Sequence, residues 1–383
     1  MGNEVENITI DRNAIKNIIQ NILNVSHKTP QKKVIKESEK GLQFADPIGG
    51  DSKKNPYEKR CHLYWNTFYV ISYDDEGYKM SFTNFIKKFG MDIDPKQKVA
   101  IINHIDNNIS YSDYENEFID SKLDDLIELD NFCQKINENS ESNIQNIEPV
   151  KMGSKVHIYL KNRAIYDYKN IYQAIYKKTD TWKEPVIVIL NKKNDHLIGM
   201  QIRNLKSDYK RLYKIYNYKQ TLELLGIEDI DNKYDLNEIV MYNKLSYFYN
   251  IFNVNYYRPI TIFEGYLDSI FFPNSIGVAG VNTDFRFLEN NELNIRYLFD
   301  NDPVGHKKAE EKLNAGYKVF LWEKLFDWIV ENKKPSDPYK FRNRISKIKD
   351  LNFLATIVKD PYKKLNLENF FSKSMFDKKY LKY

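Results

Sequence analysis

The chain has 383 residues, a formal net charge of +5 and 42% hydrophobic residues, which is enough apolar content and length for two or three packed domains. Its only cysteines, Cys61 and Cys133, exclude a disulfide framework and a four-cysteine zinc site. The apolar runs are too short for a membrane span, and the first residues lack the layout of a signal peptide. The sequence therefore predicts a soluble protein of a reducing compartment.

Positive and negative charges are unevenly distributed along the chain. Residues 101–150 contain twelve acidic and two basic residues, a balance of −10, whereas residues 151–220 contain sixteen basic and five acidic residues, a balance of +11. A basic block of this density favours a polyanionic partner. A solvated lysine-rich face explains the same charge, so both interpretations stay open on charge alone.

The N-terminal part predicts short helices around paired strands. Asp11 is expected to cap an amphipathic helix that runs to about Val25. The aromatic and β-branched segment 62–73 predicts paired strands, and residues 81–90 predict a short helix that ends at a glycine. The pair Asp94-Pro95 predicts the start of a further helix.

The middle of the chain begins with an acidic stretch and continues as a basic, mixed α/β region. Residues 106–148 predict one helix at 121–136 and otherwise a linker. Residues 185–205 predict a β-hairpin that carries Gly199 and Arg203 on its second strand. Residues 206–220 interleave lysine and arginine with tyrosine, which predicts a surface for single-stranded nucleic acid. Tyrosines that simply pack beneath a strand are the alternative.

Residues 259–322 alternate short, buried-type strands with helices, which predicts a parallel sheet. One strand ends at Glu264 and the next but one ends at Asp300 and Asp302, so these carboxylates are expected at the same sheet edge. Clustered carboxylates suit Mg²⁺ or Mn²⁺, which can align an attacking hydroxyl and stabilise a leaving pyrophosphate. Either acidic motif, taken singly, is also compatible with an ordinary surface turn that binds no metal.

The segments IFEGYLDS and LFDNDPVGHKKAEEKL resemble the two signature motifs of the TOPRIM domain of topoisomerases, primases and related nucleases. GMQIRNL and YNKLSYFYN resemble the segments that precede this domain in DnaG-type primases. KDLNFLATI followed by LENFF resembles the last part of T-even-type bacteriophage DNA primases. The resemblance covers most of residues 40–90 and 185–375.

In the N-terminal region, DPIGGDSKK and YDDEGYKMSFTNF resemble the surroundings of the two metal knuckles in the zinc ribbon of those phage primases. The metal positions hold Asp46, Gly49, Tyr73 and Glu76, whereas structural zinc sites use Cys and His. The resemblance therefore implies a zinc-ribbon remnant without zinc, unless the two matches are coincidental. The expected replacement for the ion is an apolar core of Leu63, Trp65, Phe68, Val70 and Phe82.

The predicted fold class is α/β, or α+β overall. A TOPRIM, Rossmann-like parallel sheet is expected in the catalytic domain, after a mixed α/β primase subdomain and the small N-terminal domain. The expected divisions are a template-binding domain at 1–105, an acidic linker at 106–150, a basic subdomain at 151–256, the TOPRIM domain at 257–330 and a C-terminal helical segment at 331–383.

The resemblance implies an enzyme that synthesises RNA primers from NTPs on single-stranded DNA for phage replication in the host cytoplasm, with a hexameric replicative helicase as a partner. The residues implied for Mg²⁺ and catalysis are Glu264, Asp268, Asp300, Asp302 and Asp350. Those implied for the triphosphate and the template are Arg203, Lys210, Arg211, Lys214 and Lys244.

Two other functions are compatible with the same motifs. A TOPRIM nuclease would use the same carboxylates for hydrolysis, and a non-catalytic primase relative would bind nucleic acid or a helicase. A topoisomerase is disfavoured, because only about sixty residues follow the fourth strand, too few for a separate tyrosine-bearing domain.

Overall fold

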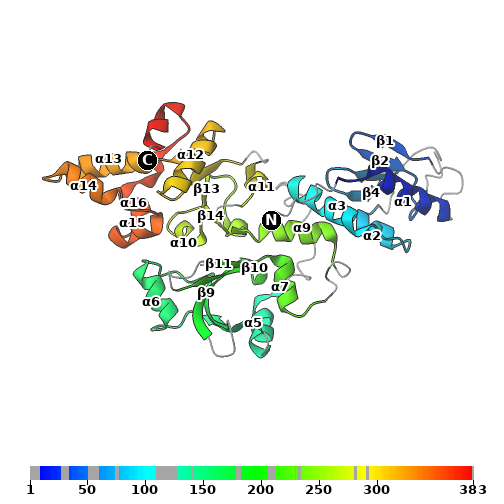
Figure 1. The fold of residues 1–383 in the computed structure, drawn as a ribbon, viewed down its shortest axis with the longest axis horizontal. Coiled ribbons are helices and arrows are strands. Elements are labelled where there is room, and N and C mark those ends of the chain that lie inside the picture. Colours follow the sequence, from blue (N-terminus) through cyan, green and yellow to red (C-terminus); the bar gives the residue numbers. More distant parts are fainter. Residues whose placement is uncertain are drawn as a thin grey trace, which may run out of the picture. The chain divides into compact units, whose positions relative to one another are not determined.

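The structure is a computed structural model, and it forms two compact units (Figure 1). One unit comprises residues 1–114 and 228–242, and the other comprises residues 115–227 and 243–383. The described residues are 9–26, 34–50, 60–73, 77–108, 127–139, 142–177, 183–205, 213–228, 230, 234–279, 283–289 and 293–381. The domain boundaries expected from the sequence stay predictions.

The first unit contains a five-stranded antiparallel sheet in the order β1-β2-β3-β4-β5. The strands are β1 Lys36–Ser38, β2 Gly41–Phe44, β3 Cys61–Tyr64, β4 Tyr69–Ser72 and β5 Lys79–Ser81. Its helices are α1 Arg12–Val25, α2 Phe82–Lys87 and α3 Pro95–Asn108, and α9 Leu236–Leu245 begins in this unit.

Local signals explain these elements and confirm their prediction. The side chain of Asp11 accepts hydrogen bonds from the first turn of α1, and that of Asp94 accepts them from the first turn of α3. The paired strands expected at 62–73 are the antiparallel pair β3 and β4. All five members of the predicted apolar cluster are buried in the core of this unit: Leu63, Trp65, Phe68, Val70 and Phe82.

The second unit begins with an antiparallel sheet in the order β11-β10-β9-β8-β7, with β6 also paired to β10. The strands are β6 Ile127–Glu128, β7 Ile144–Pro149, β8 Ile171–Lys177, β9 Lys183–Lys193, β10 His196–Asn204 and β11 Tyr213–Tyr216. The helices are α5 Leu129–Glu138, α6 Lys155–Asn162 and α7 Tyr218–Leu224. The predicted hairpin is confirmed as β9 and β10. The helix expected at 121–136 starts only at Leu129, after β6, and residues 121–126 lie outside the described residues.

The second sheet of this unit has the order β12-β14-β13-β15-β16-β17. The pairs β14-β13, β13-β15 and β15-β16 are parallel, and the two edge strands are antiparallel. The strands are β12 Phe248–Tyr249, β13 Ile260–Phe263, β14 Ser275–Val278, β15 Ile295–Leu298, β16 Lys318–Phe320 and β17 Phe371–Ser372. The alternation of strands and helices that the sequence predicts at 259–322 is therefore confirmed, and the chain is a mixed α/β protein.

Helices connect and flank these parallel strands. They are α10 Tyr266–Ser269, α11 Arg286–Glu289, α12 Pro303–Asn314, α13 Trp322–Lys333, α14 Pro338–Ile345, α15 Leu351–Ile357 and α16 Pro361–Leu365. Short 3₁₀ helices span η2 Ile251–Asn253, η3 Leu367–Phe370 and η4 Met375–Leu381. None of the helices in the described part of the chain meets the length and apolarity that crossing a bilayer requires.

Candidate active site

The turn after β13 carries the first acidic residue of the site. Glu264 follows the buried strand directly, and Gly265 leads into α10. The neighbouring strand β14 passes very close to this turn at Gly277, where an added Cβ would lie 2.3 Å from the Cα of Tyr266. Only a residue without a side chain fits at 277, so this glycine lets the turn that presents Glu264 pack against the sheet.

The turn after β15 carries two more carboxylates. Asp302 caps α12 by accepting a hydrogen bond from the backbone N–H of Gly305 at 2.8 Å, and Pro303 occupies the first helical position. An added Cβ at Gly305 would lie 2.0 Å from the carbonyl oxygen of Asp300. The first turn of α12 therefore packs directly against the backbone of Asp300.

Asn301 lies between the two aspartates and connects this turn, by hydrogen bonds, to the segment that precedes Asp350. Its amide Nδ2 donates to the carbonyl oxygens of Ser346 and Ile348, at 3.1 and 2.7 Å. Its Oδ1 lies 2.7 Å from Nε2 of the buried His306. Sequence reasoning missed both positioning residues, although an asparagine enclosed by two aspartates was a visible signal.

Asp268 is held by the start of α15. Its Oδ1 accepts a hydrogen bond from the backbone N–H of Asn352 at 2.9 Å. The side chain of Asn352 is buried and pairs with Arg163, whose Nη1 donates to Oδ1 of Asn352 at 3.0 Å. The carboxylate of Asp350 caps α15 through the backbone N–H of Phe353. The acidic residues from three distant parts of the chain are therefore linked by defined hydrogen bonds.

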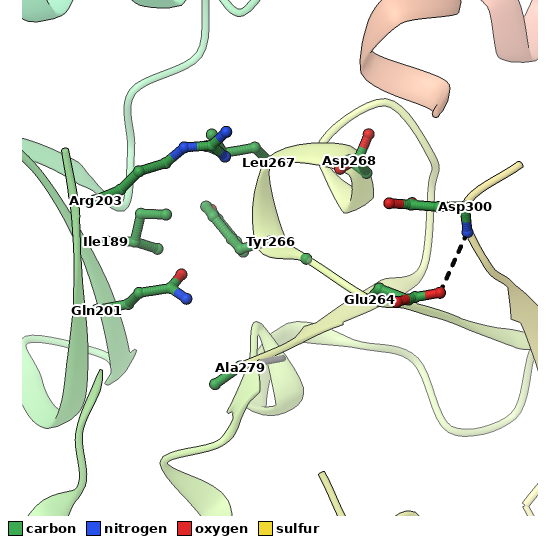
Figure 2. Close-up of a pocket in the computed structure, with 10 residues that line it drawn as sticks. Ile189, Gln201, Arg203, Glu264, Tyr266, Leu267, Asp268, Ala279 and Asp300 are labelled. Carbon is green, nitrogen blue, oxygen red and sulfur yellow. Dashed lines mark hydrogen bonds between the residues drawn. The ribbon is translucent and has the colours of Figure 1, made fainter. Parts of the chain in front are cut away.

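Three of these carboxylates line one cavity of about 310 Å³ (Figure 2). Glu264, Asp268 and Asp300 lie on one side of it, and Arg203 approaches from the strand β10 on the other side. The backbone N–H of Asp300 donates to Oε1 of Glu264 at 3.4 Å, the dashed line in Figure 2. The remaining lining residues are Ile189, Gln201, Gly265, Tyr266, Leu267 and Ala279.

Burial and mutual repulsion make this cluster electrostatically unfavourable when all its carboxylates are ionised. Burial, followed by the charges of Asp268 and Glu264, raises the pKa of Asp300 to about 9. Burial and the charge of Asp350 raise the pKa of Asp268 to about 7, against the opposing effect of the Asn352 N–H and Arg203. Burial also raises the pKa of Glu264. A divalent cation would relieve this repulsion.

The donor atoms fit Mg²⁺ or Mn²⁺ better than zinc, because the acidic cluster offers oxygen only. In the described ranges, no three His, Cys, Asp or Glu side chains already stand close enough to form a metal cage. Mg²⁺ commonly takes one or two carboxylates and completes its shell with water and substrate phosphates. Glu264, Asp268 and Asp300 are the residues from which one or two carboxylate ligands of such an ion would come.

The other predicted site residues lie in several places. Asp302 and Asp350 do not line the cavity, although the charge of each raises the pKa of Asp300. Lys244 is buried and lies 3.8 Å from a carboxylate oxygen of Asp284, and Lys214 of β11 lies over the ring of Tyr216. Neither lysine lines the cavity. Lys210 and Arg211 lie outside the described residues. Sequence reasoning missed Lys308 of α12, whose charge lowers the pKa of Glu264.

In the first unit, Asp46 is a buried hydrogen-bond acceptor at one of the expected knuckle positions. Its carboxylate accepts from the backbone N–H groups of Ile48 and Gly49 at 2.8 and 3.0 Å, and from the hydroxyls of Ser72 and Tyr78. Tyr73 is exposed, and Glu76 lies outside the described residues. The expectation that this unit binds no zinc stays a prediction.

No family model matches the chain, and no curated protein matches its sequence. Two similar solved structures are bacterial primases. The zinc-binding and RNA polymerase domains of the Aquifex aeolicus primase are 12% identical over 92% of this chain and 98% of that chain, with a TM-score of 0.26. The catalytic core of the E. coli primase is 13% identical over 55% of this chain and 66% of that chain, with a TM-score of 0.24.

Proposed function

We propose that the protein is a DNA primase, a Mg²⁺-dependent nucleotidyltransferase that makes short RNA primers on single-stranded DNA from NTPs. The observation that carries the proposal is the cavity in which Glu264, Asp268 and Asp300 face Arg203. Glu264 and Asp300 follow the carboxyl ends of adjacent parallel strands, where α/β sheets commonly bind ligands. The sequence motifs that carry these residues resemble those of TOPRIM primases, which selects primer synthesis among the reactions such a site could perform.

The chemistry requires positioning and charge stabilisation more than a protein nucleophile. When bound, Mg²⁺ would neutralise the triphosphate and favour ionisation of the attacking hydroxyl. Glu264, Asp268 and Asp300 would hold the ion, and Asp302 and Asp350 would add negative charge around it. Arg203 would orient the phosphates for in-line attack of a 3′-hydroxyl on the α-phosphorus, with pyrophosphate as the leaving group.

The finer features of the proposal come from the resemblance to T-even-type phage primases. They are a TOPRIM domain at 257–330, a hexameric replicative helicase as partner and a role in phage replication in the host cytoplasm. Lys210, Arg211, Lys214 and Lys244 are proposed to contact the nucleotide or the template.

One assay separates this function from its two rivals. The protein is incubated with circular single-stranded DNA, labelled NTPs and Mg²⁺, and the products are separated by size. Short labelled RNA is expected, and it should disappear with Asp300→Asn but persist with Asp130→Asn, a control at an exposed aspartate of α5. Shortened DNA would instead identify a nuclease, and DNA binding without either product would identify a non-catalytic subunit.

A further inference from the structure

A second cavity, of about 350 Å³, lies in the same unit between α6 and the start of β9. One face of α6 forms one wall, because residues spaced by three and four positions line up on a helix. The opposite wall comes from the start of β9 and the residue after β10. The lining residues are Lys155, Ile158, Tyr159 and Asn162 of α6, with Glu184, Pro185 and Leu205. We call this cavity the Tyr159 pocket.

Two arginines connect the Tyr159 ring with residues of the acidic cavity. The guanidinium carbon of Arg203 lies 5.7 Å from the centre of the Tyr159 ring, and that of Arg163 lies 4.9 Å from it. Arg203 also lines the acidic cavity, and Arg163 holds Asn352, whose backbone N–H binds Asp268. Leu205 lines the Tyr159 pocket and Arg203 lines the acidic cavity. The two residues are two positions apart in the chain, which separates their Cα atoms by about 7 Å in an extended segment.

The walls of the Tyr159 pocket suit a flat heterocycle that is attached to phosphates. Ile158 is 51% exposed on the open side of α6, so the helix offers apolar surface there. Tyrosine rings stack on nucleobases of any sequence, and neighbouring cations attract the connecting phosphates. Lys155 lines the pocket and Arg163 lies next to the ring, so two cations stand near Tyr159, beside one buried carboxylate, that of Glu184.

We propose that the Tyr159 pocket binds one unpaired nucleobase of the single-stranded template, stacked on Tyr159, as the strand approaches the acidic cavity. This inference rests on the proposed primase function. An incoming nucleotide suits the pocket less well, because a templated polymerase must leave that base free to pair. A template base that has not yet been copied has no partner, and a protein ring can replace the missing stacking.

The test combines protein variants with abasic sites in the DNA. Wild-type protein and Tyr159→Ala are titrated with a fluorescent oligodeoxynucleotide without Mg²⁺ or NTPs, so that synthesis does not enter. Loss of the stacking of one base should weaken the binding of Tyr159→Ala roughly tenfold, while Tyr159→Phe stays close to wild type. Tyr166→Ala, at a tyrosine that is 69% exposed and lies outside the pocket, is the matched control and should bind normally.

The decisive readout is the coupling between Tyr159 and one position in the DNA. An abasic site is placed at each position of the oligonucleotide in turn. At one position it should weaken the binding of the wild-type protein about tenfold, whereas at that position it should not weaken the binding of Tyr159→Ala further. If Tyr159→Ala does not fold, Ile158→Glu at the exposed edge of the pocket is expected to abolish the same positional effect. Additive losses at every position would overturn the proposal. A separate titration in which Tyr159→Ala binds NTPs more weakly but binds DNA normally would also overturn it.

This result is independent of whether the protein makes primers. Coupling without RNA synthesis by the wild-type protein would retain the Tyr159 pocket as a DNA site and reject the primase. RNA synthesis with purely additive losses would retain the primase and reject the pocket.

Discussion

Gly277 and Gly305 shape the acidic cavity at the scale of single residues. Each stands where another segment approaches too closely for a side chain, one against Tyr266 and the other against Asp300. The acidic residues were predictable from the sequence, because strand ends and helix caps are local signals. Most hydrogen bonds of Asn301 and Asn352 were not, because their partners, apart from His306, lie 45 or more residues away in the chain.

Replacing Gly305 by alanine should impair synthesis without changing any charge. The new Cβ would lie 2.0 Å from the carbonyl oxygen of Asp300, so either the helix or the aspartate must move. Overpacking of this kind costs about 1–3 kcal/mol of stability, and we expect at least a tenfold loss of primer synthesis. Val304→Ala, at an exposed position of the same helix, is the control. Wild-type synthesis by Gly305→Ala would show that the turn tolerates displacement.

The raised pKa values predict how stability depends on pH and Mg²⁺. In the metal-free protein the pKa of Asp268 is about 7 and that of Asp300 about 9, both above the ordinary value of 3.8. Groups with raised folded-state pKa values favour the fold most at low pH, and this contribution disappears as pH rises from about 4 to about 9. Thermal melting in EDTA should therefore show a falling Tm across this range.

Asp300→Asn should flatten that decline, and Mg²⁺ should raise the Tm most at the alkaline end, where the carboxylates are ionised. An equal Mg²⁺ effect on wild type and Asp300→Asn would remove Asp300 from the ion's ligands.

At the scale of elements, the longer strands and the capped helices were predictable, whereas the edges of the sheets were not. The hairpin of β9 and β10 follows from its alternation and turn, and α12 follows from Asp302-Pro303 at its start. The edge strands β12 and β17 contain two residues each, too few to show a period. The strand β6 is also only two residues long, so no signal in the sequence indicates it within the helix expected at 121–136. The helix α5 begins after this strand, at Leu129.

The five-stranded sheet of the first unit should depend on Asp46 and not on zinc. Asp46→Ala would leave the hydroxyls of Ser72 and Tyr78 without this buried acceptor, which costs about 1–3 kcal/mol for each such group. We expect a lower Tm for the variant, a Tm of the wild type in Mg²⁺-free buffer that does not change when EDTA is added, and far less than one zinc per chain by elemental analysis. Close to one zinc per chain would show that the knuckle positions have been misinterpreted.

The basic segment that follows β10 should make the affinity for DNA depend on salt. If Lys210 and Arg211 bind phosphates, replacing both by alanine should weaken binding and reduce the salt slope by about one unit for each phosphate that is no longer neutralised. Anisotropy titrations at several salt concentrations measure this slope. An unchanged slope would assign the two residues to a solvated surface.

At the scale of the whole molecule, both proposed sites lie in the same compact unit. The second unit contains both the acidic cavity and the Tyr159 pocket, so the proposed chemistry and the proposed template contact belong to one body. Which residues join each unit was not predictable from the sequence, because residues 228–242 return to the first unit from the middle of the chain.

The central claim is that the carboxylates of the cavity catalyse primer synthesis. The most direct measurement is Mg²⁺-dependent incorporation of labelled NTPs on circular single-stranded DNA by wild type, Glu264→Gln and Asp300→Asn, with DNA binding measured in parallel. We predict short RNA from the wild type and none from either variant, while all three proteins bind DNA. Near-normal synthesis by either variant, or no RNA from a folded wild-type protein that binds its template, would contradict the account.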